Sequence, residues 1–192
     1  MGRNGEAIAE LKRAESLDPL SLIISADLAD VLCVAHFYDE SVRQSQKAIE
    51  MDPNFAVAHY LLGQALEQKH KHDEAITEFR RAIDLSGGNT AFESNLANAY
   101  AVSGRKEQAI KIVKDLESRQ SQNSSTDASI ALIYVGLGDN DRAMIWLNKA
   151  YQARFNPSIL MRPVFDPLRS DPRFQDLLRR IGLPQAGRDL LR

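Results

Sequence analysis

Small side chains recur along this chain at a fixed spacing of 34 residues. They occupy the positions Ala7, Ser41, Ala75, Ala109 and Ala143. In most copies a large apolar residue follows four positions later and a small residue follows seven positions later, so all three share one side of a helix. A stripe of small, large and small residues suits a helix that a neighbour approaches closely. The pattern therefore predicts one such helix in every unit of 34 residues.

A second stripe with the same period lies between these helices. It consists of apolar–small pairs, each followed three residues later by Leu or Tyr. The pairs are Leu28-Ala29, Leu62-Gly63, Leu96-Ala97 and Ile130-Ala131. Each unit therefore holds two helices, and short links between them make consecutive helices antiparallel neighbours.

Capping and periodicity together predict ten helices. They cover residues 5–17, 21–36, 39–51, 55–69, 73–85, 90–102, 106–120, 125–136, 140–153 and 171–182. The polar stretch 118–125 lacks the Asp-Pro pair that ends the first two units, at Pro19 and Pro53. We expect this stretch to be the loosest joint between the helices.

This pattern resembles the tetratricopeptide repeat (TPR), whose units of 34 residues are helix–turn–helix pairs. The copy nearest to the family pattern consists of His59, Leu62, Gly63, Leu66, Ala75, Phe79 and Ala82. The resemblance implies an all-α fold, a right-handed superhelix of antiparallel helix pairs. Its array would cover residues 1–157, as a half repeat at 1–19 and repeats at about 20–53, 54–87, 88–121 and 122–157.

Residues 158–192 break the period and are expected to form a capping segment. Asp166-Pro167 and Asp171-Pro172 are helix-start signals, with Asp as the N-cap and Pro at the first helical position. An apolar stripe follows at helical spacing, formed by Phe174, Leu177, Leu178 and Ile181. The segment also resembles the tail of TPR regions in large bacterial signalling proteins, in which a DNA-binding, kinase or cyclase domain precedes the repeats.

The array is expected to begin with half a unit. Residues 2–6 read as a turn that leads into the second helix of a repeat whose first helix is absent. Ile8 and Leu11 would then lack one packing partner. Two explanations stay open: the chain is a fragment of a longer protein, or this face is a natural dimerisation surface.

In the TPR family the first helix of each pair lines a concave groove, and the resemblance implies the groove positions here. They are Asp27, Asp30, Tyr60, Gln64, Glu67, Asn95 and Asn98, with Cys33, Ser94, Ser129 and Leu132 beside them. Amides would hold the backbone of an extended peptide, because each offers a donor and an acceptor. These side chains could equally be ordinary solvated residues. We expect Asn98 to be exposed, so that its replacement by Ala weakens binding and leaves folding intact.

The charge at these positions indicates the kind of partner. None of them is Lys or Arg, which argues against the family subtype that captures an acidic C-terminal carboxylate. Acidic residues in the groove favour a neutral or basic protein or peptide instead.

Composition excludes other classes of function. The net charge of −2 gives no global attraction to nucleic acid or to anionic membranes, and Cys33 is the single cysteine, so no zinc signature can form. The sequence has no phosphate-binding loop and no nucleophile motif, and His70 and His72 read as a solvated corner. We expect no catalysis, no cofactor and no metal, and a cytoplasmic location by default, since no run of eighteen apolar residues exists.

The sequence thus predicts a protein–protein interaction scaffold. Two alternatives remain: self-association as a homodimer through the terminal helix faces, and a non-catalytic part of an enzyme such as a kinase or cyclase.

Overall fold

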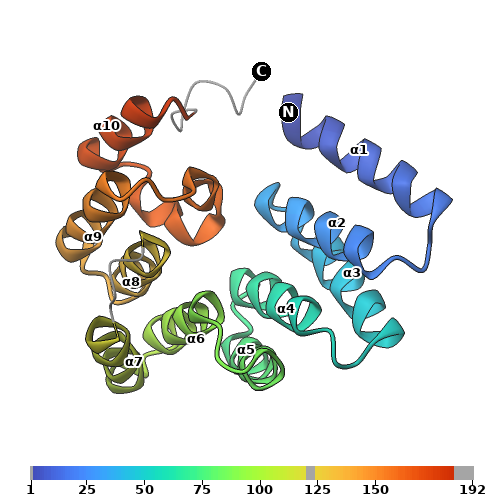
Figure 1. The fold of residues 1–192 in the computed structure, drawn as a ribbon, viewed down its shortest axis with the longest axis horizontal. Coiled ribbons are helices and arrows are strands. Elements are labelled where there is room, and N and C mark those ends of the chain that lie inside the picture. The colour runs from blue at the N-terminus through green and yellow to red at the C-terminus, as the bar shows by residue number, and fades with distance from the viewer. Residues whose placement is uncertain (1, 120–123, 184–192) are drawn as a thin grey trace. The chain divides into compact units, whose positions relative to one another are not determined.

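The computed structural model describes residues 2–119 and 124–183, which form helices and no strand (Figure 1). The chain divides into two compact units, residues 1–92 and 93–192. The helices are α1 (Gly2–Leu17), α2 (Leu22–Val34), α3 (Tyr38–Met51), α4 (Ala56–Gln68), α5 (His72–Ser86), α6 (Thr90–Val102), α7 (Lys106–Ser118), α8 (Ser124–Gly136), α9 (Asn140–Gln152), the 3-10 helices η1 (Pro157–Met161) and η2 (Pro163–Leu168), and α10 (Pro172–Ile181).

The predicted all-α fold of repeated helix pairs is confirmed, and each predicted helix is present with its ends within three residues of the expected ones. One detail at the start of the chain is wrong. The sequence predicts a turn at residues 2–6, but they are the first part of α1. The predicted loose joint at 118–125 falls largely on residues 120–123, which lie outside the described residues.

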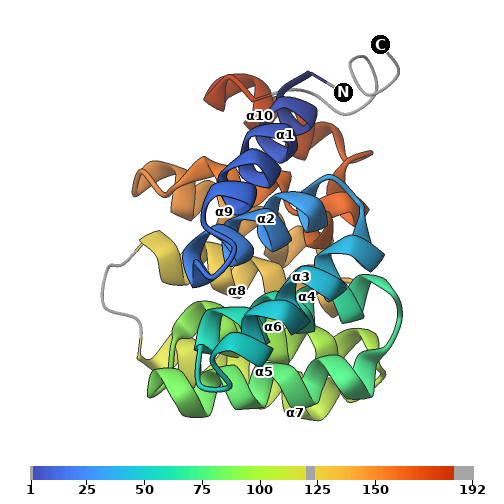
Figure 2. The same cartoon turned by 90° about the vertical axis from the view of Figure 1, so that its right-hand side faces the viewer.

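In the first unit each helix packs against the next, and α2 also packs against α4 (Figure 1). Figure 2 shows α1 lying against α2 from a second direction. The predicted small positions Ser41 and Ala75 are buried between the helices. Ser41 of α3 is fully buried, and its hydroxyl donates a hydrogen bond of 2.8 Å to the carbonyl oxygen of Ala29 in α2. This bond satisfies a polar group that would otherwise be costly to bury.

The equivalent contact one repeat later depends on a glycine. A Cβ atom at Gly63 of α4 would lie 2.7 Å from two ring atoms of Phe79 in α5. The spacing predicts that Gly63 faces Ala75, but the atoms nearest to this position belong to Phe79. Phe79 is completely buried, so its ring cannot move aside without disturbing its neighbours.

Replacing Gly63 with Ala should therefore lower the free energy of unfolding by about 1–3 kcal/mol, as overpacking does. Gly5 offers a matched control, because a Cβ atom there meets nothing within 4 Å. Gly5→Ala should raise the free energy of unfolding by roughly 0.5–1 kcal/mol, through helix propensity. Urea denaturation of both variants checks the pair, and equal effects of the same sign would contradict the assigned contact.

In the second unit α8 packs against α7, α9 and η2, and α10 packs against α9. The small positions are again completely buried: Ala97, Ala109, Ala131 and Ala143. The same register of small residues therefore shapes both units, although the larger side chains between these positions differ.

The end of the described chain confirms one predicted helix start and corrects the other. The Asp171 side chain caps α10 by accepting a 2.8 Å hydrogen bond from the backbone N–H of Arg173, and Pro172 is the first helical residue. Asp166-Pro167, in contrast, lies inside the 3-10 helix η2 and starts no α-helix. Of the predicted stripe, Phe174, Leu177 and Leu178 are completely buried and Ile181 is half-buried. Residues 184–192 lie outside the described part.

The corner after each first helix needs a left-handed backbone. Four residues 34 positions apart have positive φ: His36 at 64°, His70 at 59°, Gly104 at 83° and Gly138 at 76°. Glycine adopts this conformation freely, whereas a residue with a Cβ atom does so at a cost of about 1–2 kcal/mol. The first unit therefore has histidines at positions where the second unit has glycines.

His70→Gly should relieve this strain and raise the free energy of unfolding by about 0.5–1 kcal/mol, net of the larger entropy that glycine adds to the unfolded chain. The reverse change at an equivalent corner, Gly104→His, should lower it. Thermal unfolding followed by circular dichroism checks both. A destabilised His70→Gly variant would show that the contact of the His70 ring with His72 outweighs the backbone strain.

Candidate partner-binding surface

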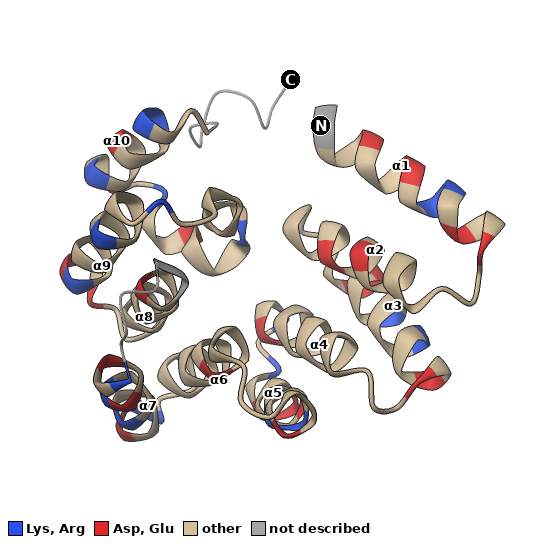
Figure 3. Ribbon diagram, in the orientation of Figure 1, with Lys and Arg blue, Asp and Glu red and all other residues tan. Residues whose placement is uncertain are grey.

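Charge is distributed unevenly between the two helices of each pair. The first helices α2, α4, α6 and α8 contain acidic residues but neither Lys nor Arg (Figure 3). The second helices α3, α5, α7 and α9 all carry Lys or Arg. A partner that contacts the first helices therefore meets neutral or negative charge.

Two of the five acidic side chains of the first helices are paired with cations. Glu93 of α6 forms a 2.8 Å ion pair with Arg119, and Asp127 of α8 lies 3.5 Å from the Nζ atom of Lys149. Asp27 of α2 differs from these residues. It is exposed, and within residues 2–119 and 124–183 its carboxylate has no ion-pair partner. Asp30, one turn further along α2, is half-buried.

Glu67 of α4 is an acidic residue whose charge is suppressed. Only 7% of its surface is exposed, and burial raises the pKa of its carboxyl from the usual 4.5 to about 8. The desolvated carboxylate is disfavoured, so the side chain is largely protonated at neutral pH. The sequence predicts that Glu67 adds negative charge to the groove, and this structural environment opposes that role.

The raised pKa of Glu67 makes stability depend on pH. Between pH 4.5 and about 8 the folded state holds a proton that the unfolded state releases. The protonated Glu67 side chain therefore makes its full contribution to the free energy of unfolding below pH 4.5. As pH rises above 4.5 this free energy falls, by up to about 1.4 kcal/mol per pH unit. Glu67→Gln should flatten this dependence and exceed the wild type in stability at pH 8. Urea denaturation from pH 5 to pH 8, with the exposed Glu50→Gln as control, tests this, and parallel curves for wild type and Glu67→Gln would contradict it.

Tyr60 lies in an aromatic cluster of the first unit. Its ring stacks on Phe92 with centroids 4.4 Å apart, and its hydroxyl accepts a 2.8 Å hydrogen bond from the amide of Gln64. Tyr60 and Phe55 are partly buried and pack against the core residues Ala26, Ala29 and Leu61. Of the predicted site residues, the structure thus brings Tyr60 and Gln64 into contact. It also shows Phe55, which lies just before the helical pattern of α4 and was not predicted.

We use the name acidic–aromatic face for Asp27 and Asp30 of α2 together with Phe55 and Tyr60 at the start of α4. These residues belong to two helices that pack side by side. Asp30 lies one helical turn beyond Ala26, which is part of the core against which the two aromatic rings pack. The face combines partly exposed aromatic surface with negative charge.

The amides predicted to hold a peptide are mostly used inside the fold. Asn98 is 1% exposed, and its Nδ2 atom donates a 3.0 Å hydrogen bond to the carbonyl oxygen of Leu132 in α8. A Cβ atom at Gly136 would lie 2.6 Å from the same nitrogen. The expectation that Asn98 is an exposed residue of no importance for folding is therefore wrong, because its amide links two helices of the second unit.

Gln64 and Asn95 are also buried, at 7% and 4% exposure. Gln64 belongs to the first unit and Asn98 to the second, so an extended peptide held by both amides stays a prediction.

His59 has a structural role that the sequence pattern did not indicate. Its Nδ1 atom lies 2.6 Å from a carboxylate oxygen of Glu78, and its Nε2 atom lies 3.1 Å from the carbonyl oxygen of Pro53. The ring therefore joins the second helix of its own pair to the preceding turn.

The predicted dimer face on α1 is only partly covered. Ile8 and Leu11 are half-buried. Three large apolar residues at the end of α1 and the start of α2 are far more exposed: Leu17 at 80%, Leu20 at 77% and Ile23 at 62%. The largest apolar exposure at this end of the chain therefore lies beyond the two residues that the sequence indicated.

Metal-binding and membrane-spanning features are absent from the described part of the chain. No three His, Cys, Asp or Glu side chains gather there in a way that would hold a metal ion. None of its helices is long and apolar enough to cross a bilayer.

The repeated helix pairs, the buried small residues and the left-handed corners define a helical repeat protein, and sequence comparison identifies the family. Three sequence profiles described as tetratricopeptide repeat match residues 26–90, 66–133 and 128–157. Together they span residues 26–157, more than half of the chain. The chain belongs to the tetratricopeptide-repeat family, and this class of protein acts as a scaffold for protein–protein interactions.

Solved structures agree in fold. TTC0263, a thermophilic TPR protein in Thermus thermophilus, aligns with a TM-score of 0.67 and 16% identity over 87% of this chain and 91% of that one. MamA gives a TM-score of 0.57 with 24% identity over 79% and 89%. YrrB, described as a TPR protein with an unusual peptide-binding site, gives 0.51 with 18% identity over 82% and 80%. The sequence matches none of the curated proteins with which it was compared.

Proposed function

We propose that this protein is a non-enzymatic scaffold whose first unit binds a partner segment rich in basic and apolar side chains. The segment docks on the acidic–aromatic face. The main support for this proposal is Asp27. It is an exposed acidic residue on a first helix, and no described residue balances the charge of its carboxylate. The resemblance of residues 165–174 to the tails of bacterial signalling proteins favours a place in a larger protein of that kind.

The face suits such a segment in two ways. The carboxylates attract Lys or Arg, and the absence of cations from α2 and α4 removes any local repulsion. The partly buried rings of Phe55 and Tyr60 offer apolar area, and a guanidinium group gains further by lying over an aromatic ring. No chemical step is needed, so binding itself is the activity.

Selection from a library of random displayed peptides tests the proposed specificity. Peptides retained by the wild type should be enriched in Arg and Lys next to aromatic or aliphatic residues. Asp27→Asn should weaken a selected peptide by up to about fivefold, as expected for one exposed charge pair, and less so at high salt. The matched control is Asp84→Asn on the second helix α5, which is also exposed.

Two results would contradict the proposal. The selected peptides could show no excess of cationic residues, or Asp84→Asn could weaken binding as much as Asp27→Asn. In either case the negative charge of the acidic–aromatic face is not what the partner recognises.

Self-association is a second candidate, favoured by the exposed apolar residues Leu17, Leu20 and Ile23. Sedimentation equilibrium of the wild type and of Leu20→Glu distinguishes it from peptide binding. A concentration-dependent dimer that Leu20→Glu abolishes, while peptide affinity is unchanged, assigns the two activities to different surfaces.

A further inference from the structure

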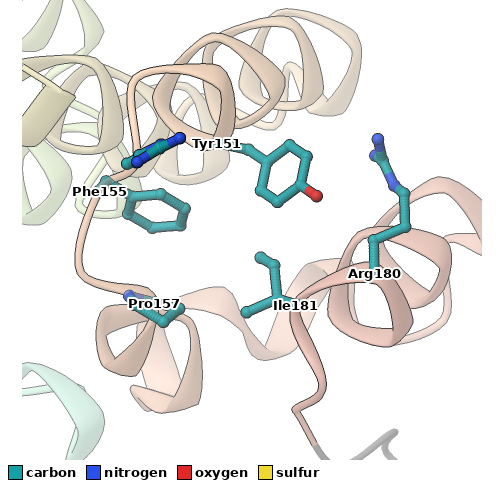
Figure 4. Close-up of a pocket in the computed structure, with 6 residues that line it drawn as sticks. Tyr151, Phe155, Pro157, Arg180 and Ile181 are labelled. Carbon is teal, nitrogen blue, oxygen red and sulfur yellow. The ribbon is translucent and has the colours of Figure 1, made fainter.

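A pocket of about 290 Å³ lies in the second unit, where the end of α9 meets the end of α10. It belongs neither to the acidic–aromatic face nor to the first helices. The lining residues are Tyr151, Arg154, Phe155, Pro157, Arg180 and Ile181 (Figure 4). Three segments supply them: the last turn of α9, the link to η1 together with the first residue of η1, and the last turn of α10.

Four of the six lining side chains are apolar or aromatic. Figure 4 shows the rings of Tyr151 and Phe155, the Pro157 ring and the Ile181 side chain around one space. Phe155 is 8% exposed, and its backbone N–H is fixed by a 3.1 Å hydrogen bond to the carbonyl oxygen of Ala150. The volume is near the lower end of the range for small-molecule sites, about 300 Å³. The pocket therefore suits a short apolar body.

The polar part of the lining is cationic. Arg180 is held in place by Asp176, at 3.1 Å from its Nε atom, and by Asn148, at 3.0 Å from its Nη2 atom. Its guanidinium carbon lies 5.0 Å from the centre of the Tyr151 ring. A guanidinium group has five N–H donors, so donors remain for a ligand. The C-terminal ends of α9 and α10 each add a partial negative charge of about half a unit. Their sum is smaller than the positive charge of the two lining arginines, Arg154 and Arg180.

Arg154 is the second cation and has an unusual backbone. Its φ angle is 56°, in the left-handed region that glycines occupy at the corners Gly104 and Gly138. Among the described residues its guanidinium group has no hydrogen-bond or ion-pair partner. The strain at Arg154 is therefore not offset by a contact of its side chain within the described fold.

We propose that this pocket binds a monocarboxylic acid with a short apolar body, of the class of medium-chain fatty acids and aryl-alkanoic acids. The carboxylate pairs with the guanidinium groups of Arg154 and Arg180. The apolar body packs against Phe155, Pro157 and Ile181. A neutral ligand of the same shape would lose the ion pairs, and a carboxylate without an apolar body would lose the packing.

Titration of the full chain with octanoate, followed by calorimetry, tests the proposal. Octanoate should bind saturably, while octanamide and acetate should bind at least about tenfold more weakly, because each lacks one of the two recognition elements. Displacement of octanoate by phenylbutyrate would show that both kinds of acid share one site.

Arg154→Gly is the decisive variant, because it removes the cation and relieves the backbone strain together. Its thermal midpoint should be equal to or above that of the wild type, so lost binding cannot be attributed to unfolding. Octanoate affinity should fall by about five- to tenfold. Arg179→Ala is the matched control, since Arg179 pairs with Asp176 on the same helix but does not line the pocket.

Three results would overturn the proposal. They are no saturable binding of octanoate, equal binding of octanoate and octanamide, and equal losses in Arg154→Gly and Arg179→Ala. The last result would show that the general positive charge of this end of the second unit attracts the acid and that the pocket does not.

Discussion

The structure depends on a contact in which the two helices of a repeat come closer than ordinary side chains allow. Ser41 reaches the backbone carbonyl of Ala29, and Gly63 leaves the space that the Phe79 ring fills. Completely buried small residues recur in the second unit, at Ala97, Ala109, Ala131 and Ala143. This packing therefore fixes which side of each first helix is buried against its partner. The neighbouring first helix covers another side, as α4 does for α2. The acidic–aromatic face is the part of α2 and α4 that both contacts leave partly uncovered.

The fold could be predicted from the sequence because packing of this kind requires only small side chains at a fixed spacing along the chain. Ala75, Ala109 and Ala143 are fully buried, as their period indicates. The site was harder to predict because the register gives the direction of a side chain but not how far the next helix covers it. Asp27 and Asn95 are 68 residues apart and so occupy equivalent positions, yet Asp27 is exposed and Asn95 is buried.

The Asp-Pro helix-start signals predict only part of the structure that follows α9. An N-cap depends on a few adjacent residues, so Asp171 and Pro172 start a helix as expected. The same dipeptide at Asp166-Pro167 lies in a 3-10 helix, because the preceding Pro163 already begins that segment. The pocket between α9 and α10 has no sequence signature, since its lining residues come from three segments with no common spacing.

The corner residues connect local backbone geometry to the behaviour of the whole array. The stability of stacked repeats is close to a sum of terms for each repeat and for each neighbouring contact. A strained corner lowers the term of its own repeat and leaves the helix faces unaltered. His36 and His70 lie in one unit, and Gly104 and Gly138 lie in the other. Evolution or design can therefore set the order in which the repeats open by exchanging one residue at a corner, without altering any surface that a partner recognises.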